Sequence, residues 1–268
     1  MADLDLLRTT VPGRLVALTS LLLACAFPPP VRAQDTLTVA AYNIKHGRGL
    51  DGRVDLERVA AVLHGIGADV VALQEVDRGT ERTDRVDQPD VLARLTETRA
   101  SFGAHRPYQG GEYGNAILSR LPVLRRATRP LAPAAGSALT VHEVVVGVGD
   151  PERPVSFVSV HLAGSPRDRL LQADSLTAHF AGVGHPVVLA GDFNSRPGDP
   201  VMDRLREAWT VVPKDGPAET FPADAPDREI DYVLFRPASA FEIVEHRVIE
   251  EAAASDHRPI RAVLRVLR

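Results

Sequence analysis

The sequence has one cysteine among its 268 residues, Cys25, so the chain cannot form an internal disulfide. Aromatic residues make up only 5% of the chain, and no segment is an aromatic-rich hairpin of the kind that inserts into membranes. An excess of basic residues is also missing, because the formal net charge is −4 at pH 7. The chain therefore lacks the broad positive surface that drives tight, non-specific binding to duplex DNA.

The remaining composition is that of a globular protein. Hydrophobic residues make up 44% of the chain and charged residues 25%, which is enough apolar material for a substantial core. We find no internal repeat, no low-complexity block and no linker long enough to separate domains. These features predict a single domain over residues 34–268.

The first 33 residues predict a secretory signal peptide. Two arginines precede an apolar stretch at 15–27, and residues 31–33 place small side chains where a signal peptidase cleaves. Removing this segment, with its three Arg and two Asp, changes the net charge from −4 to −5. We therefore expect an exported protein, periplasmic or extracellular. The alternatives are an uncleaved anchor, for which the stretch is short, and a lipoprotein lipidated at Cys25.

Hydrophobic periodicity predicts an alternation of strands and helices, with mixed sheets covered by outer helices. The predicted strands are 36–44, 70–73, 113–129 with a hairpin break at 121–122, 138–148, 155–162, 186–190, 230–235, 241–249 and 259–267. The predicted helices are 56–63 capped by Asp55, 87–98, 165–182 and a short one beginning at Asp199-Pro200.

Polar residues recur where these strands end. They are Asn43, Gln74-Glu75, His161, Asp192, Asn194, Asp231 and Ser255-Asp256-His257. Side chains at one edge of a sheet converge on a cleft, so we expect these residues to meet. Side-chain alternation along an extended segment would point Asp192 and Asn194 the same way. Read alone, each of these residues could instead cap a helix, form a turn or, for His161, sit satisfied in the core.

Taken in order, these motifs resemble the endonuclease/exonuclease/phosphatase superfamily, which includes DNase I and the exonuclease III type of abasic endonuclease. The resemblance rests on Gln74-Glu75, Gly191-Asp192-Phe193-Asn194 and Ser255-Asp256-His257, and it runs from about Thr38 to Pro259. It implies an α/β fold, a DNase I-like four-layer α/β/β/α sandwich of two mixed sheets with outer helices. It also implies metal-dependent hydrolysis of a phosphoester.

The resemblance implies a divalent cation, Mg²⁺ with Mn²⁺ as the alternative. Such cations prefer oxygen ligands and keep several waters, so few protein ligands are needed. Glu75 is the implied principal ligand, with Asn43 beside it and Asp256 contributing. The residues expected to bind the substrate are Tyr113, Asn115 and Arg78.

The same resemblance gives each catalytic residue a role. Asp192 orients or deprotonates the attacking water, Asn194 donates to a phosphoryl oxygen, and His161 adds a second donor or acid. His257 acts on the phosphate or the water, and Asp231 fixes the tautomer of its ring.

Charged residues also gather in the loops that follow the first two predicted strands. They include Lys45, His46, Arg48, Asp51, Asp55, Arg78, Arg82 and Asp84. They could clamp an anionic substrate, or they could form a solvated cluster of salt bridges, and the sequence leaves both interpretations open.

The sequence therefore predicts a secreted, metal-dependent phosphohydrolase, a phosphodiesterase or phosphatase that works by in-line attack of water. The alternatives are a catalytically silent binding module on the same fold and an endonuclease acting on DNA. The expected partner is a phosphoester, whether a small phosphorylated molecule, a lipid head group or a nucleic acid. No stable protein partner is implied, and we expect a monomer.

Overall fold

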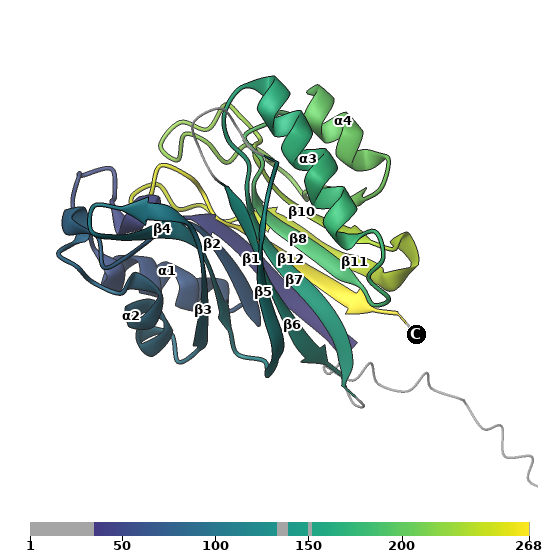
Figure 1. Cartoon of the computed structure of the whole chain (residues 1–268), viewed down its shortest axis with the longest axis horizontal. Coiled ribbons are helices and arrows are strands. Elements are labelled where there is room, and N and C mark those ends of the chain that lie inside the picture. The colour runs from purple at the N-terminus through teal and green to yellow at the C-terminus, as the bar shows by residue number, and fades with distance from the viewer. Residues whose placement is uncertain (1–34, 133–138, 150–151, 268) are drawn as a thin grey trace, which may run out of the picture. The chain divides into compact units, whose positions relative to one another are not determined.

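Two six-stranded mixed sheets form the centre of the fold within the described residues (Figure 1). The computed structural model describes residues 35–132, 139–149 and 152–267, so the expected signal segment lies outside them. One sheet has the order β11-β12-β1-β2-β4-β3, with bounds β1 (Thr36–Asn43), β2 (Val70–Arg78), β3 (Arg99–Tyr108), β4 (Gly111–Ser119), β11 (Phe241–Val248) and β12 (Ile260–Val266). The other has the order β5-β6-β7-β8-β10-β9, with bounds β5 (Val123–Pro130), β6 (Thr140–Val148), β7 (Arg153–His161), β8 (Val187–Asp192), β9 (Thr210–Val211) and β10 (Asp231–Arg236).

Each sheet has a parallel pair near its centre, β1 with β2 and β7 with β8. Parallel neighbours need a crossover connection, and helices supply it here. The helices are α1 (Leu56–Ile66), between β1 and β2, α2 (Gln88–Leu95), α3 (Pro166–Phe180), between β7 and β8, and α4 (Pro200–Arg206). Short 3₁₀ turns are η2 (Lys45–Gly47), η3 (Glu81–Thr83) and η4 (Ala238–Ala240).

Three apolar clusters hold four layers together, which confirms the predicted α/β/β/α sandwich. Alternate residues of both sheets, such as Val39, Phe157 and Val188, fill the space between the sheets. The opposite faces pack on helices: α1 and α2 cover the first sheet, and α3 and α4 cover the second (Figure 1). Among the described residues, none of the helices is long and apolar enough to cross a membrane.

Capping contacts confirm the predicted starts of α1 and α3, whereas the side chain of Asp199 makes no capping hydrogen bond at the start of α4. Asp55 accepts a hydrogen bond from the backbone of Arg58 at the start of α1, at 2.8 Å. Ser165 and Asp168 form a reciprocal capping box at the start of α3, where Pro166 occupies the first turn. These contacts satisfy backbone N–H groups that have no partner within the helix.

The sequence analysis missed β3 and the short β9. β3 is an edge strand whose outer residues are exposed, and its sequence is rich in Ala, Gly and Arg rather than in β-branched residues. Its pairing with β4 depends on close backbone contact: a methyl group added at Gly114 would lie 2.2 Å from the backbone oxygen of Gly103. That requirement is tertiary, so it leaves no periodic pattern in the sequence.

The Gly114 contact predicts a specific instability. Gly114→Ala should lower the free energy of unfolding by about 1–3 kcal/mol, because the added methyl meets backbone that cannot move aside. Gly182→Ala is the matched control, since nothing lies within 4 Å of a methyl group placed there. Urea denaturation of the mature chain measures both. Equal midpoints for the two variants would contradict the close approach of β3 to β4.

Candidate active site

The predicted site residues meet because the last residues of three strands and the first residue of a fourth point to the same side of their sheets. Asn43 continues the inward row of β1, His161 that of β7, Asp192 that of β8, and Asp231 begins the inward row of β10. All four side chains therefore face the space between the sheets at one end of the sandwich. Each is less than a tenth exposed.

Asp192 is the centre of this group. Its Oδ2 atom lies 3.2 Å from the Asn43 amide nitrogen, 3.6 Å from His161 Nε2 and 3.7 Å from His257 Nε2. Burial, and next the negative charge of Asp231, raise the pKa of the Asp192 carboxyl, while the two histidines oppose that shift. A buried carboxylate with a raised pKa accepts a proton more readily than an ordinary aspartate does.

Asp231 and His257 form a buried, oriented pair. His257 Nδ1 lies 3.0 Å from Asp231 Oδ2, and the hydroxyl of Thr220 donates to the same oxygen at 2.5 Å. This contact holds the ring so that Nε2 faces Asp192. Sequence reasoning paired these two residues by family resemblance, and the structure brings them together.

His257 is a cation at neutral pH. Burial, the largest single influence, would lower the pKa of its ring, but the carboxylates of Asp231, Asp192 and Asp256 together raise it to about 9. Its Nε2 is therefore a charged donor directed into the site. The group suits the stabilisation of developing negative charge better than it suits the removal of a proton.

Asn194 differs from the sequence argument. The strand ends at Asp192, and Asn194 has a left-handed backbone with φ 49°, so strand alternation does not set its direction. Its backbone N–H donates to Asp192 Oδ1 at 2.8 Å, and its amide donates to the Leu162 carbonyl at 2.8 Å and to Asp192 Oδ2 at 3.2 Å. The turn interpretation is thus correct, and the turn positions Asp192 within the candidate site.

Glu75 projects from a bulge in β2. The β2–β4 register shifts between Leu73 and Val76, and Glu75 has φ 57°, which is uncommon for a residue other than glycine. Its Oε1 accepts from the Asn43 amide nitrogen at 3.1 Å, and the side chain is half-buried. The bulge thereby turns this carboxylate toward the shared cluster.

Asn43 and Asp256 have contacts that bear on the expected metal site. The Asn43 amide nitrogen faces both Glu75 and Asp192, while its oxygen accepts from the backbone of Lys45 at 3.1 Å. Asp256 Oδ2 accepts from Lys45 Nζ at 2.6 Å. Glu75 and Asp256 are partly exposed carboxylates, and carboxylate oxygens are the donors that Mg²⁺ prefers, so the donor chemistry suits such an ion. A cation would compete with Lys45 for Asp256.

A second group has metal-like spacing: Asp192, Asp231 and His257 offer ligand atoms within 4.8 Å of one another. His257 binds Asp231 through Nδ1 and keeps its second proton at neutral pH because its pKa is raised to about 9. A cation at this position would have to displace that proton. The geometry therefore offers two candidate positions for a cation, this group and the partly exposed carboxylates of Glu75 and Asp256.

Asn115 and Tyr113 of β4 line the site from the first sheet. Asn115 is fully buried and donates to the Ser159 carbonyl at 3.2 Å, and Gln74 donates to the Ser159 hydroxyl at 2.9 Å. Asn115, Gln74 and Ser159 thus form a polar floor that joins the sheets beneath the site. The Tyr113 ring lies 5.8 Å from His105, measured between ring centroids.

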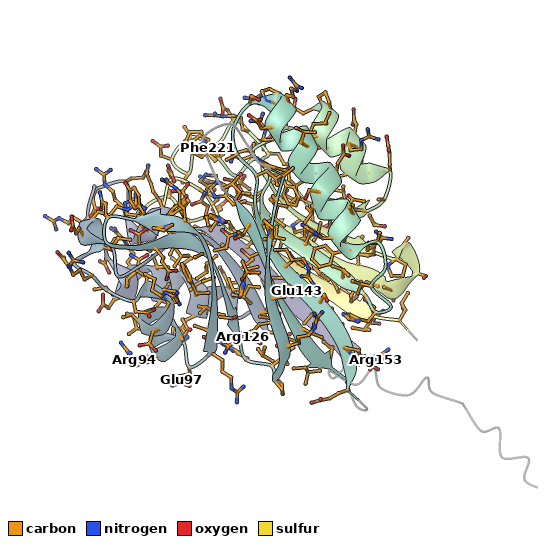
Figure 2. All side chains as sticks on the ribbon, in the orientation of Figure 1. Arg94, Glu97, Arg126, Glu143, Arg153 and Phe221 are labelled. Carbon is orange, nitrogen blue, oxygen red and sulfur yellow. The ribbon has the colours of Figure 1, made fainter. Side chains whose placement is uncertain are left out.

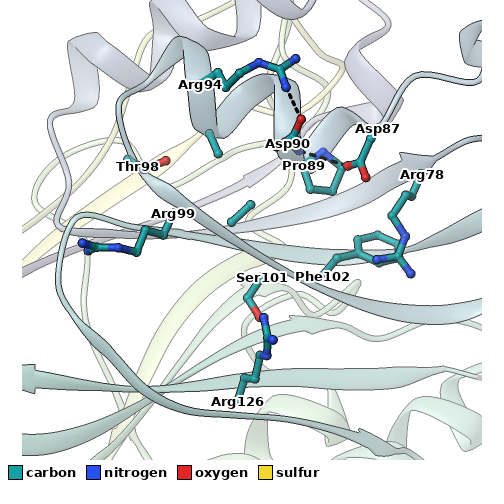
Figure 3. A pocket seen from close by; sticks show the side chains of 12 residues that line it. Arg78, Asp87, Pro89, Asp90, Arg94, Thr98, Arg99, Ser101, Phe102 and Arg126 are labelled. Atoms are coloured by element: carbon teal, nitrogen blue, oxygen red, sulfur yellow. Dashed lines mark hydrogen bonds and ion pairs between the residues drawn. The ribbon is translucent and has the colours of Figure 1, made fainter.

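Arg78 is not brought to this cluster. Its guanidinium pairs with Glu112 and lies 4.5 Å over the Phe102 ring. Figure 3 shows Arg78 on the wall of a separate cavity of about 590 Å³, with Asp87 and Arg126 among its lining residues. None of those lining residues belongs to the Asp192 cluster, so the geometry gives the expected substrate role of Arg78 no support.

The sequence analysis did not identify Thr220 and Phe221, which contact the Asp231–His257 pair: Thr220 donates to Asp231, and the Phe221 ring packs near the His257 ring. Phe221, labelled at the upper end of the sheets in Figure 2, has its ring 4.7 Å from the His257 ring, between centroids. Both residues belong to the irregular segment before β10, eleven and ten positions from Asp231. No local pattern marks them, because their partners are set by the tertiary fold.

The four-layer sandwich with a buried acid and histidine cluster at one end is a DNase I-like architecture, and comparison with known families agrees. The model of the endonuclease/exonuclease/phosphatase family matches residues 40–257, so the chain belongs to this family. Its members are generally hydrolases that act on phosphoesters, typically with a divalent metal.

Individual relatives cover most of the chain. The protein YbhP of Escherichia coli strain K12, named as uncharacterized, is 26% identical over 249 residues, which are 87% of this chain and 98% of YbhP. An endonuclease/exonuclease/phosphatase from Beutenbergia cavernae is 26% identical with a TM-score of 0.67, covering 87% of this chain and 72% of that one. A mannosyl-6-phosphatase of Bacteroides thetaiotaomicron is 16% identical with a TM-score of 0.63, covering 85% and 99%.

The raised pKa of His257 predicts how stability depends on pH. The contribution of the Asp231–His257 pair is fully present below about pH 6.5, the ordinary histidine pKa, and is lost as pH rises through about 9. In chelator, the free energy of unfolding should fall by an amount on the order of 2 kcal/mol across this window. Asp231→Asn should flatten this fall, as measured by denaturant titrations at several pH values. Equal slopes for parent and variant would contradict the pairing.

Proposed function

We propose that the protein is an exported, divalent-metal-dependent phosphoester hydrolase in which water attacks the phosphorus in line. The observation that carries this proposal is the convergence of His161 Nε2 and His257 Nε2 on one oxygen of buried Asp192, at 3.6 and 3.7 Å. A structural cluster would need no second histidine there, and Asp231 already satisfies His257 through its other nitrogen.

The residues divide the work by charge. Asp192, with its raised pKa, receives the proton of the attacking water, and Asn194 and Asn43 hold its oxygens in place. His257, charged and fixed by Asp231, donates from Nε2 to a phosphoryl oxygen as negative charge develops. His161 supplies a second donor beside Asp192.

Glu75 and Asp256 would hold the cation, which when bound would neutralise charge on the phosphate and on the leaving oxygen. The half-buried position of Glu75 on a strained bulge supports this role, because backbone strain of about 1–3 kcal/mol persists where the surrounding structure fixes it for function. Lys45 neutralises Asp256 in the absence of a cation.

The substrate class we favour is a small phosphoester rather than duplex DNA. The mature chain would carry a net charge of −5 once residues 1–33 are removed, so long-range attraction to a polyanion is weak. The mannosyl-6-phosphatase that shares this fold shows that the architecture accommodates a sugar phosphate in that protein.

A substrate panel tests the proposal. The mature protein should hydrolyse at least one of p-nitrophenyl phosphate, bis(p-nitrophenyl) phosphate, inositol phosphates, sphingomyelin, plasmid DNA or abasic DNA with Mg²⁺ or Mn²⁺, and chelator should abolish turnover. His257→Ala should reduce kcat/KM by about 10²-fold or more, because it removes the charged donor. Glu75→Gln should raise the metal concentration needed for half-maximal activity, since it removes a charged ligand.

Glu97→Gln is the matched control for Glu75→Gln. Glu97 is an exposed carboxylate in the turn between α2 and β3, labelled in Figure 2, and it should change neither activity nor metal dependence. Absence of metal-dependent turnover on every member of the panel would refute catalysis. It would favour the silent binding module, which should still bind a phosphoester without releasing product.

Export is a separate part of the proposal and has its own test. The signal-like segment predicts that a bacterial host will release a mature chain beginning near Gln34 into the periplasm or medium. N-terminal sequencing of fractionated protein measures this, and Cys25→Ala should leave it unchanged. Loss of membrane association in Cys25→Ala, or retention of residues 1–33 in the parent, would support the lipoprotein or the anchor instead.

A further inference from the structure

A group of two arginines and two tyrosines borders the site on the side of the first sheet. We call it the arginine–tyrosine rim; it consists of Arg82, Arg106, Tyr108 and Tyr113. Arg106 pairs with Tyr113 across β3 and β4, and Tyr113 pairs with Asp77 across β4 and β2, two residues beyond Glu75. Tyr113 and Arg106 of the rim therefore lie on the strands next to β2, close to Glu75, the expected metal ligand.

The two guanidinium groups share the same two rings. The Arg82 Cζ atom lies 4.7 Å from the Tyr108 centroid and 5.6 Å from that of Tyr113. Arg106 Cζ lies 5.0 and 5.6 Å from the same centroids. Contacts of this kind orient a guanidinium while leaving its edge donors free.

One carboxylate holds one of the two cations. Asp77 is fully buried and binds Arg82 through both oxygens, at 2.7 and 2.8 Å. The exposed Arg106 has its ring contacts but no carboxylate within ion-pair distance among the described residues. The positive charges of Arg82 and Arg106 thus lie near the same two tyrosine rings, and Asp77 neutralises only Arg82. An anion placed between the two guanidinium groups would be attracted to both.

A row of rings links the rim to the reaction centre. The Tyr113 ring lies 5.8 Å from His105, which lies 6.4 Å from His161, and His161 contacts Asp192. A ligand that reaches from Asp192 to the rim must therefore carry its two anionic groups several bonds apart, as on the two ends of a sugar chain.

We propose that the arginine–tyrosine rim is a subsite for a second anionic group, so that the preferred substrates are small phosphoesters that carry a phosphate or carboxylate at the far end from the scissile phosphate. This inference rests on the proposed hydrolase function and specifies its substrate class. Planar guanidinium groups bind phosphates and carboxylates in two-point contacts, so both chemistries suit the subsite.

Two matched pairs of compounds separate the two sources of negative charge. Fructose 1,6-bisphosphate differs from fructose 6-phosphate by a distant phosphate, and 6-phosphogluconate differs from glucose 6-phosphate by a distant carboxylate. With Mg²⁺ and phosphate release as the readout, the parent should show a KM at least about tenfold lower for the member with two anionic groups in one or both pairs, equal to about 1.4 kcal/mol. Only the pair whose second group fits the rim will show the difference.

Arg106→Ala should reduce the ratio of the two KM values toward one, because it removes the guanidinium that has no carboxylate partner among the described residues. Arg99→Ala is the matched control, since Arg99 is an exposed arginine at the other end of the same strand, and it should keep the parent ratio. Arg106→Lys should restore part of the ratio through charge alone. Equal KM values within both pairs in the parent, or an unchanged ratio in Arg106→Ala, would overturn the inference.

Calorimetric binding in chelator separates this inference from the proposed function. Tighter binding of fructose 1,6-bisphosphate than of fructose 6-phosphate, lost in Arg106→Ala, supports the rim even if no phosphoester is hydrolysed. Hydrolysis of p-nitrophenyl phosphate without any preference inside either pair leaves the hydrolase standing and refutes the rim.

Discussion

The burial of one carboxylate, that of Asp192, is the constraint on which the site depends. An ionised carboxylate away from water is costly unless its oxygens are satisfied, and its neighbours come from separate parts of the chain: Asn43 from β1, His161 from β7 and His257 from the turn before β12. Asp192 is satisfied only when both sheets are assembled in the correct register. The same contacts that stabilise the buried carboxylate thereby assemble the acid and histidine cluster.

Much of the fold and the centre of the site could be predicted because their determinants are local. Strand alternation and helix caps depend on a few adjacent residues, so the sequence shows them directly. Glu75, Asp192 and His257 each end an apolar run or lie just before one. Other features have no local cause. Thr220 acts on a residue eleven positions away, β3 is held by the approach of Gly103 to Gly114, and Arg78 turns to Glu112. Strand alternation could not predict the direction of the Asn194 side chain, because β8 ends two residues earlier, at Asp192, and Asn194 has left-handed backbone.

Left-handed backbone gathers around the site. Lys45, His46, Glu75 and Asn194 all have positive φ, between 46° and 57°. Lys45, His46 and Asn194 follow the ends of β1 and β8, and Glu75 lies in the bulge of β2. Side chains usually avoid this region, so tertiary contacts must hold it, as the Asn194–Asp192 turn does. The strand ends thus determine where the residues of the candidate site lie, and the unusual backbone determines where their side chains point.

The polar floor of Gln74, Asn115 and Ser159 separates two very different environments. Below it lie the apolar side chains between the sheets, and above it lie the charged groups around Asp192. The boundary is a single layer of amide and hydroxyl groups, so the change from charged to apolar surroundings is abrupt. Water that enters with a substrate could form hydrogen bonds with the amide and hydroxyl groups of this layer, whereas the apolar side chains below it offer none. The floor therefore divides the apolar interior of the sandwich from the charged candidate site by the width of one hydrogen-bonded layer.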